Sequence, residues 1–220
     1  AQCLVGSEMC IRDSSWLMGQ QFDAEGNPLY GAYDKKGELL IFSKELPDGN
    51  YTNEMEGYRY NKQEVPAGSE WSCSTDIPLL RYSEVLLMKA ECLLRTNQSG
   101  AGELVTEVRK RAFKADPSKA TVTDDELKEN SSYQWGVVEN YQITDRGNQD
   151  PIEFGRLFDE RCWEFVWEGY TRRDMIRFGI FCKKSWLSHK PQGDHRIVFP
   201  IPQRAVDANP KLTQNPAYAN

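Results

Sequence analysis

The most regular hydrophobic pattern in the chain lies between residues 76 and 113, where apolar positions recur at steps of three and four. This spacing places the apolar side chains on one face of a helix. Asp76 can cap a first helix that we expect to stop near Asn97 and Gly100, and Ser99 can cap a second. The expected apolar faces consist of Leu79, Tyr82, Leu86, Ala90 and Leu93, and of Ala101, Leu104, Val105, Val108 and Ala112. Since neither helix can bury its face alone, the pattern predicts an antiparallel helix hairpin over residues 76–113.

A second helical pattern runs from residue 152 to residue 179. Its first helix carries apolar residues in step at Phe154, Leu157, Phe158, Cys162 and Phe165. Gly169 offers a left-handed stop, Thr171 and Asp174 have capping-box spacing for a short following helix, and Gly179 ends it. The pattern predicts a second helix hairpin, and the two hairpins together resemble tetratricopeptide-like units.

The rest of the chain is less periodic. Residues 16–75 are rich in Gly, Asn, Asp and Tyr around one short apolar run at 38–42, which predicts loops with a minor β-hairpin. Residues 123–126 have capping-box spacing for one short helix, and residues 130–150 suit a long loop with several aromatic residues. From residue 196 onwards we expect an extended tail with one helical turn. The predicted fold is therefore mainly α, with long loops, a minor β-hairpin and an extended C-terminal tail.

Composition narrows the function classes. The chain has 39% hydrophobic residues and a net charge of −6, and no long Lys/Arg block is present that would neutralise nucleic-acid phosphates. No apolar run approaches the roughly 20 residues that cross a bilayer, and the start lacks the zones of a secretion signal. The stretch Leu4 to Ser14 back-translates to a common transposase sequencing adapter. We therefore expect residues 1–14 to be a read-through artefact and residues 15–220 to be part of a longer protein.

The cysteines outside the first fourteen residues are Cys73, Cys92, Cys162 and Cys182. Their spacing matches no zinc motif, so we expect no metal site. Whether they pair is left open by the sequence. Cys92 and Cys162 fall within helical patterns, which favours burial as small apolar residues.

Three segments, in this order, carry a resemblance to a known family. They are IPLLRYSEVLLMKAECLLRTNQ followed by EVRKRAF, then LFDERCWEFVWEGYTRRDMIRFG, and finally FPIPQRAVDANPKLTQNPAY. Their order and spacing over residues 76–220 resemble the C-terminal portion of the SusD/RagB family. Cys162 stands where the family usually has a second Arg, and Phe113 where a Gly commonly ends the helix.

The resemblance implies a nutrient-binding lipoprotein on the outer face of an outer membrane, whose signal and lipidated Cys lie outside this chain. It further implies capture of an oligosaccharide or polysaccharide, delivery to a SusC-like TonB-dependent transporter, no catalysis and no cofactor. Some relatives are associated with peptides rather than glycans. The residues that match the family's structural motif are Arg81, Glu84, Glu91, Glu160, Arg161, Glu164, Glu168, Gly169, Asp174 and Gly179.

Sugar binding needs flat aromatic faces beside polar groups, and such groups usually lie on loops over a rigid scaffold. Aromatic residues outside the helical faces are therefore our candidate ligand-binding residues. They are Tyr58, Tyr60, Trp71, Tyr133, Trp135 and Tyr141. The alternative is that these aromatics pin the loops onto the helices.

Other functions remain as alternatives. Glu160, Glu164 and Glu168 share one helical face, a spacing that could mimic the paired carboxylates of a glycosidase. Arg156 and Arg161 lie within helical reach, which favours ion pairs instead. No nucleophile elbow, phosphate-binding loop or zinc-protease motif is present, so the sequence does not indicate an enzyme. The main rival to glycan capture is a helical-repeat module that binds another protein.

Overall fold

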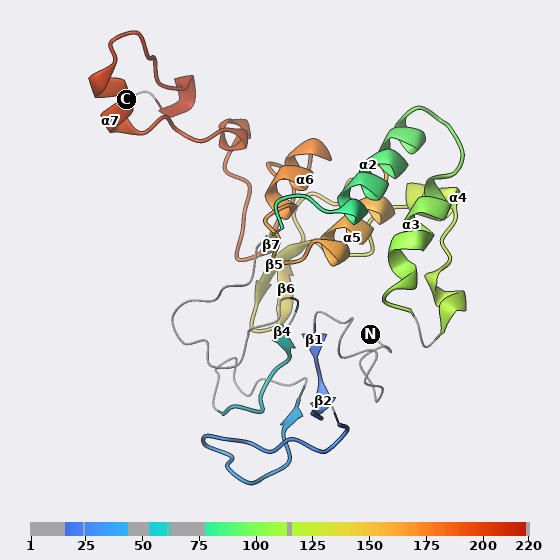
Figure 1. The fold of residues 1–220 in the computed structure, drawn as a ribbon. Coiled ribbons are helices and arrows are strands. Elements are labelled where there is room, and N and C mark those ends of the chain that lie inside the picture. Colours follow the sequence, from blue (N-terminus) through green and yellow to red (C-terminus); the bar gives the residue numbers. More distant parts are fainter. Residues whose placement is uncertain are drawn as a thin grey trace. The chain divides into compact units, whose positions relative to one another are not determined.

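The computed structural model describes residues 16–23, 25–43, 53–60, 62, 78–113 and 116–218. The expected artefact at residues 1–14, Trp71 and Cys73 lie outside the described residues. The chain divides into two compact units, Ala1–Glu126 and Leu127–Asn220, and the fold is mainly helical with small sheets (Figure 1), as predicted. No helix in the described part of the chain has the length and apolar character needed to span a bilayer.

The first unit begins with two small antiparallel sheets. β1 (Trp16–Leu17) pairs with β4 (Arg59–Tyr60), and β2 (Gly19–Gln20) pairs with β3 (Ile41–Phe42). The apolar run at 38–42 therefore forms a strand at its end, as the sequence predicted, and Leu39 adds an isolated bridge to Tyr30.

The first helix hairpin is formed by α2 (Tyr82–Arg95) and α3 (Ala101–Lys110). The start and the buried face of α2 differ from the prediction. Leu79 precedes the helix and is 91% exposed, and Tyr82 is 73% exposed. The buried face of α2 consists of Glu84, Leu87, Ala90, Glu91 and Leu94. The predicted face was wrong because its apolar period begins at Leu79, outside the helix, and two carboxylates occupy the buried face.

The connection between α2 and α3 confirms the predicted stop, since Asn97 and Gly100 both have positive φ angles, of 53° and 103°. Ser99, however, does not cap α3. The carboxylate of Asp124 accepts hydrogen bonds from the backbone N–H groups of Gly100, at 2.9 Å, and Gly102, at 2.5 Å. The cap thus comes from a residue more than twenty positions further along the chain, which local spacing could not reveal.

Two short elements follow, η3 (Pro117–Ala120) and α4 (Asp124–Lys128). The predicted capping box of α4 is confirmed. The Glu126 carboxylate accepts a hydrogen bond from the N–H of Thr123 at 2.6 Å, and the N–H of Glu126 donates to the Thr123 hydroxyl at 3.2 Å.

The second unit contains the second predicted helix hairpin, α5 (Gly155–Glu164) and α6 (Thr171–Arg177). Gly169 and Gly179 have positive φ angles, of 78° and 69°, as their predicted stops require. The capping box at Thr171 is wrong because the Asp174 carboxylate binds Arg161 on α5. The buried core beside these helices contains Trp135, Ile152, Phe158, Met175 and Ile180.

Residues 130–150 are not the long loop that we predicted. They form the antiparallel pair β5 (Gly136–Glu139) and β6 (Gln142–Asp145), and β7 (Trp186–Leu187) adds to β5 in parallel. Asn140 and Tyr141 connect β5 to β6 with φ angles of 49° and 62°. Both central residues of this two-residue turn are left-handed, as in the tight hairpin turns that suit the twist of paired strands.

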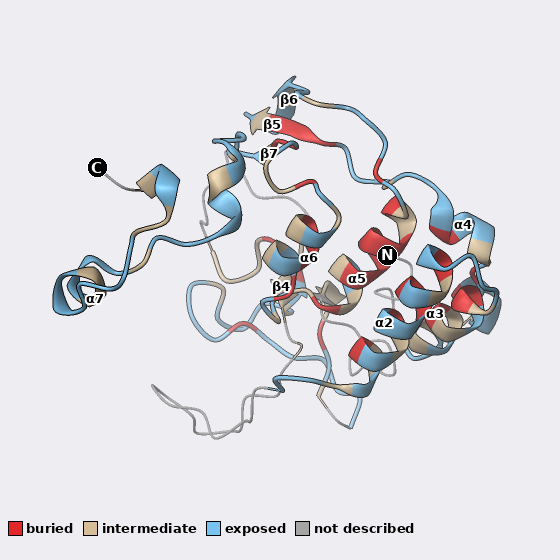
Figure 2. Ribbon diagram, turned by 90° about the horizontal axis from the view of Figure 1, so that it is seen from above, coloured by how far each residue is buried: buried red, intermediate tan, exposed pale blue. Residues whose placement is uncertain are grey.

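The tail contains η4 (Asp194–Ile197), α7 (Gln203–Ala208) and η5 (Pro216–Tyr218). The helical turn expected near residue 204 is therefore present. The tail bends back on itself, because Gln214 exchanges hydrogen bonds with the backbone of Ile201 at 2.7 and 2.8 Å. Figure 2 shows buried residues on α5 and β5, whereas none of the residues of α7 is buried.

The described cysteines, Cys92, Cys162 and Cys182, are free thiols. Cys92 is exposed, so its predicted burial was wrong, because it lies on the side of α2 away from the buried Ala90 and Leu94. Cys162 is partly buried beside the core of the second unit.

Candidate ligand-binding site

The predicted aromatic residues that the structure describes belong to both compact units of the chain. In the first unit, Tyr58 is 36% exposed and Tyr60 lies on β4 with intermediate exposure. Trp71 lies outside the described residues. In the second unit, Tyr133 and Trp135 precede β5, and Tyr141 lies in the turn after it.

Trp135 is a core residue. Its side chain is only 7% exposed and packs at 6.3 Å from the ring of Phe158 and at 6.2 Å from that of Trp186. Tyr133, which is 45% exposed, meets the Trp135 ring edge-on at 4.9 Å. The alternative that an aromatic pins its loop to the helices therefore describes Trp135, and we leave it out of the candidate binding surface.

Tyr141 has the opposite character. It is 71% exposed, in the turn between β5 and β6, and its φ of 62° is one that side chains larger than Gly or Asn adopt at a cost of about 1 kcal/mol. A bulky aromatic held outward in such a backbone conformation contributes little to the core. Among the predicted residues that the structure describes, Tyr141 is the one most available to a ligand.

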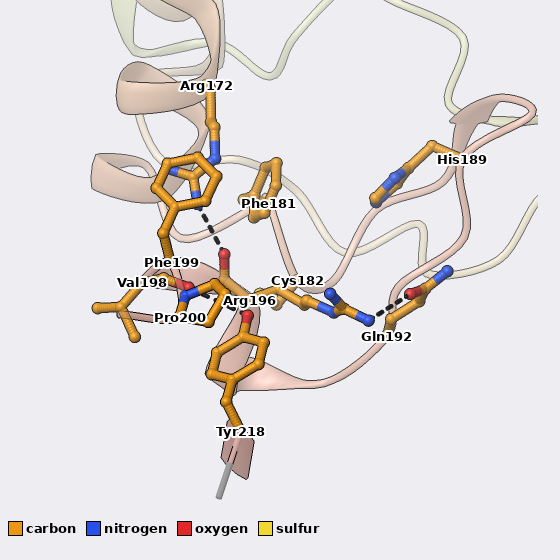
Figure 3. A pocket seen from close by; sticks show the side chains of 10 residues that line it. All are labelled: Arg172, Phe181, Cys182, His189, Gln192, Arg196, Val198, Phe199, Pro200 and Tyr218. Carbon is orange, nitrogen blue, oxygen red and sulfur yellow. Dashed lines mark hydrogen bonds between the residues drawn. The ribbon is translucent and has the colours of Figure 1, made fainter. Parts of the chain in front are cut away.

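A pocket of about 220 Å³ lies elsewhere in the second unit, between α6 and the tail (Figure 3). The helix α6 supplies one wall, the segment on either side of β7 supplies a second, and the tail from η4 to η5 closes the third. The side chains that line it are Arg172, Phe181, Cys182, His189, Gln192, Arg196, Val198, Phe199, Pro200 and Tyr218.

Arg172 organises the wall where α6 meets the tail. Its Nη2 donates hydrogen bonds to the backbone carbonyls of Arg196, at 2.7 Å, and Ile197, at 3.1 Å. Its guanidinium also lies over the rings of Phe199, at 4.2 Å, and Phe181, at 4.9 Å. Two aromatic contacts and two carbonyls fix the plane of the guanidinium, so the group is positioned before any ligand arrives.

The opposite wall is held more loosely. Arg196 is exposed and donates from Nη2 to the Gln192 amide oxygen at 3.2 Å. The Tyr218 hydroxyl donates to the carbonyl of Val198 at 3.1 Å, which fixes the end of the tail against the pocket. Phe199 remains 71% exposed, so most of its ring is accessible.

His189 carries a polar atom without a partner. Its imidazole stacks on Trp186 with 3.7 Å between ring centroids, and its Nε2 is buried without a hydrogen-bond partner among the described residues. Leaving a buried polar atom unsatisfied costs about 1–3 kcal/mol. Since His189 lines the pocket, a ligand hydroxyl or acid group can relieve that cost.

The carboxylates that the structure shows buried in the second unit, Asp159, Glu160 and Asp174, make contacts that hold the fold together. Asp174 is 1% exposed and binds Arg161, which is fully buried, at 2.8 and 3.2 Å. Asp159 accepts hydrogen bonds from the Ser131 and Ser132 hydroxyls at 2.6 and 2.8 Å. Glu160 is paired with Arg156 at 3.0 Å, as predicted. The geometry thus shows these groups in structural contacts rather than facing one another across a cleft.

Neither a metal-binding group nor a pKa shift in the described residues indicates a catalytic centre. Among the described residues, no group of three or more His, Cys, Asp or Glu side chains is placed to hold a metal ion. Burial, with the nearby Asp174 and Asp159 carboxylates, raises the pKa of the Cys162 thiol to about 12. Burial lowers the pKa of Lys184, whose Nζ donates to the backbone carbonyl of Asn148 at 3.1 Å.

The pocket residues were not among the sequence-predicted site residues. For this part of the chain the sequence predicted only a short helix and an extended tail with one helical turn. A signal was present nonetheless, because residues 171–204 hold eight Lys or Arg and two Asp in a chain with a net charge of −6.

Comparisons with known proteins agree on one family. A model described as the SusD family matches residues 16–197. The chain is 27% identical over 167 residues to the starch-binding protein SusD of Bacteroides thetaiotaomicron, covering 72% of this chain and 24% of that protein. It is 29% identical over 150 residues to the SusD-like protein P25 of Formosa agariphila, covering 64% of this chain and 24% of that protein. It is 25% identical over 185 residues to the SusD-like protein P38 of the same organism, covering 84% of this chain and 32% of that protein. The chain therefore spans a quarter to a third of the length of these relatives.

Proposed function

The chain belongs to the SusD family, and from that membership we propose that it helps to capture a glycan at a cell surface without cleaving it. The observation that carries the proposal is the family match over residues 16–197, which is joined by a relative named as starch-binding. We further propose that the protein faces outward from an outer membrane on a lipid anchor, and that it delivers the glycan to a SusC-like TonB-dependent transporter.

The second unit offers surfaces suited to this task. The pocket combines the exposed ring of Phe199 and the partly exposed ring of Tyr218 with guanidinium and amide groups that can bond sugar hydroxyls. Its volume of about 220 Å³ is below the range of about 300–1,000 Å³ usual for enclosed drug-sized sites, which suits one or two sugar rings of a longer chain. Tyr141 adds an exposed aromatic face. The absence of catalysis is proposed because the buried carboxylates serve ion pairs and hydrogen bonds.

The test is retention of the 220-residue chain on affinity gels that contain starch or other neutral and acidic polysaccharides. We expect retention on at least one of them, with Phe199→Ala and Tyr141→Ala each reducing it severalfold. Tyr33→Ala is the matched control, because Tyr33 is 82% exposed in the first unit and forms no part of the pocket. Circular dichroism must be unchanged in all three variants. Failure of every polysaccharide to retard the protein would overturn the proposal for this chain.

A second function, docking to another protein, is favoured by two large apolar side chains. Trp163 on α5 is 51% exposed and Trp167 just after it is 78% exposed. Exposed tryptophans are common at the centre of protein interfaces. If these residues contact the transporter, Trp167→Ala should weaken co-purification with the purified transporter and leave glycan retention unchanged. Unchanged co-purification in that variant would contradict the docking role.

A further inference from the structure

The charged side chains that line the pocket between α6 and the tail are all positive. It contains the cationic side chains Arg172 and Arg196 together with His189, and no Asp or Glu is among its ten lining residues. The nearest acidic side chain on α6 is already engaged, because Asp174 binds Arg161 at 2.8 Å and Arg177 at 3.3 Å. The positive charge facing the pocket is therefore not neutralised within its walls.

The hydrogen-bonding groups of the pocket are mostly donors. Arg172 uses Nη2 for two backbone carbonyls, whereas its Nε and Nη1 have no hydrogen-bond partner among the described residues. The exposed contact of Arg196 with the Gln192 amide oxygen, at 3.2 Å, can give way to a stronger acceptor. His189 Nε2 is buried and unpartnered within the described part of the chain. Figure 3 shows Arg172, His189 and Arg196 on different sides of the pocket.

Such a set of groups discriminates between ligands. A neutral sugar presents hydroxyls that both donate and accept, so it is matched by a mixture of carboxylates, amides and donors. Tyr218 and His189 can each donate or accept, but the side-chain acceptor of Gln192 is occupied by Arg196, no carboxylate lines the pocket, and the two guanidinium groups only donate. A planar or tetrahedral oxyanion, which only accepts, satisfies them better, and guanidinium groups bind such anions through charge-assisted hydrogen bonds.

We propose that this pocket binds the acidic group of a charged saccharide, a uronate carboxylate or a sulfate ester. The Arg172 and Arg196 guanidinium groups and the His189 imidazole hold the anion, and the accessible ring of Phe199 stacks against the attached sugar. The inference rests on the proposed function, because it names the class of glycan that the same protein captures.

The test is titration calorimetry of the 220-residue chain with matched pairs of oligosaccharides. One pair is tetragalacturonate and its fully methyl-esterified form, and the other is a sulfated tetrasaccharide and its desulfated form. In each pair the sugar chain is the same and only the charge differs. We expect at least one acidic member to bind about tenfold more tightly than its neutral counterpart. The pair that shows the difference identifies the carboxylate or the sulfate.

Two arginine variants locate the effect. Arg196→Gln removes an exposed charge at the pocket without disturbing a buried contact, and it should lower the affinity for the acidic oligosaccharide about tenfold while changing that of the neutral one less than twofold. Arg204→Gln removes an exposed charge from α7 outside the pocket and should change neither affinity. Arg172→Gln is not used alone, because Arg172 also anchors the backbone of η4.

The outcomes separate the inference from the proposed function. Equal affinity for the acidic and neutral members, or equal losses in Arg196→Gln and Arg204→Gln, would overturn the acidic-saccharide site. Binding of neutral oligosaccharides alone would also overturn it, while the proposed glycan capture would stand. Binding of no oligosaccharide and no polysaccharide would overturn both.

Discussion

Arg161 and Asp174 form a deeply buried ion pair. Their side chains are 0% and 1% exposed, with Nε to Oδ2 at 2.8 Å, and the pair joins α5 to α6. Two charges at such depth are expensive to desolvate, and the pair offsets this only while both partners remain. The pair thus fixes how the two helices meet, which in turn positions Arg172 at the pocket.

Replacing Asp174 should therefore destabilise the protein. In Asp174→Asn the buried Arg161 guanidinium loses the negative charge that it contacts at 2.8 and 3.2 Å, and we expect the free energy of unfolding to fall by about 3–5 kcal/mol. Urea denaturation followed by circular dichroism measures the change. Glu107→Gln, in an ion pair whose side chains are 59% and 60% exposed, serves as control and should leave the urea midpoint unchanged. A similar small effect in both variants would contradict the structural role of the buried pair.

The cysteines should differ in reactivity. The thiolate is the reactive form, and with a pKa of about 12 Cys162 is about 0.01% thiolate at pH 8, whereas Cys92 is exposed on α2. Iodoacetamide at pH 8 should alkylate Cys92 and spare Cys162 in the folded protein. Peptide mass spectrometry identifies the modified sites, and both cysteines should be alkylated in concentrated urea. Rapid modification of Cys162 before unfolding would be inconsistent with its burial.

Helices with regular apolar spacing could be predicted from the sequence. Features that depend on contacts between residues far apart in the chain could not. Both helix hairpins follow from apolar spacing and from stops such as Gly169, because these signals are local in sequence. The cap of α3 by Asp124 joins residues 22 and 24 positions apart, and the Arg161 pair joins residues 13 apart, so neither appears in a local pattern. The β5–β6 hairpin was missed although Val137, Val138 and Ile143 flank Asn140, because its turn contains no glycine.

That turn supports a prediction that separates stability from binding. Asn140 and Tyr141 both have positive φ angles, and Gly accepts such angles without the penalty that Tyr carries. Tyr141→Gly should raise the melting temperature by a few degrees, which corresponds to about 0.5–1 kcal/mol, and should reduce glycan retention. Thermal scans and affinity gels measure the two effects.

Asn140→Gly provides the matched control, because it relaxes the neighbouring position of the same turn without removing an aromatic ring. We expect it to preserve glycan retention and to change the melting temperature little, since Asn already tolerates a left-handed conformation. If Tyr141→Gly retained full glycan binding, Tyr141 would have no part in the binding surface.

At the scale of the whole molecule, the family could be recognised from three ordered segments, but the candidate pocket could not. Its walls come from residues between Arg172 and Tyr218, on one helix, a segment around a two-residue strand and a folded-back tail. Sequence periodicity does not say where such a tail returns. Trp135, in contrast, was selected because it lies outside a helical pattern, although a tryptophan between short strands and helices can equally be a core residue, as it is here.

Net charge sets how a charged glycan approaches this molecule. The chain carries −6 overall, while residues 171–204 hold eight Lys or Arg and two Asp. At 10 mM salt the Debye length is about 30 Å, so the whole chain's negative charge opposes an approaching anion; at 150 mM it is about 8 Å, and only charges near the pocket act. We expect the affinity for the acidic tetrasaccharide to change less than about threefold between these concentrations and then to fall towards 1 M, as the pocket itself is screened.

Calorimetry at each salt concentration measures this affinity, with the neutral tetrasaccharide as a salt-independent control. A steep, continuous fall from 10 mM upwards would show instead that attraction by a wider basic surface dominates, because long-range repulsion by the rest of the chain would then be absent.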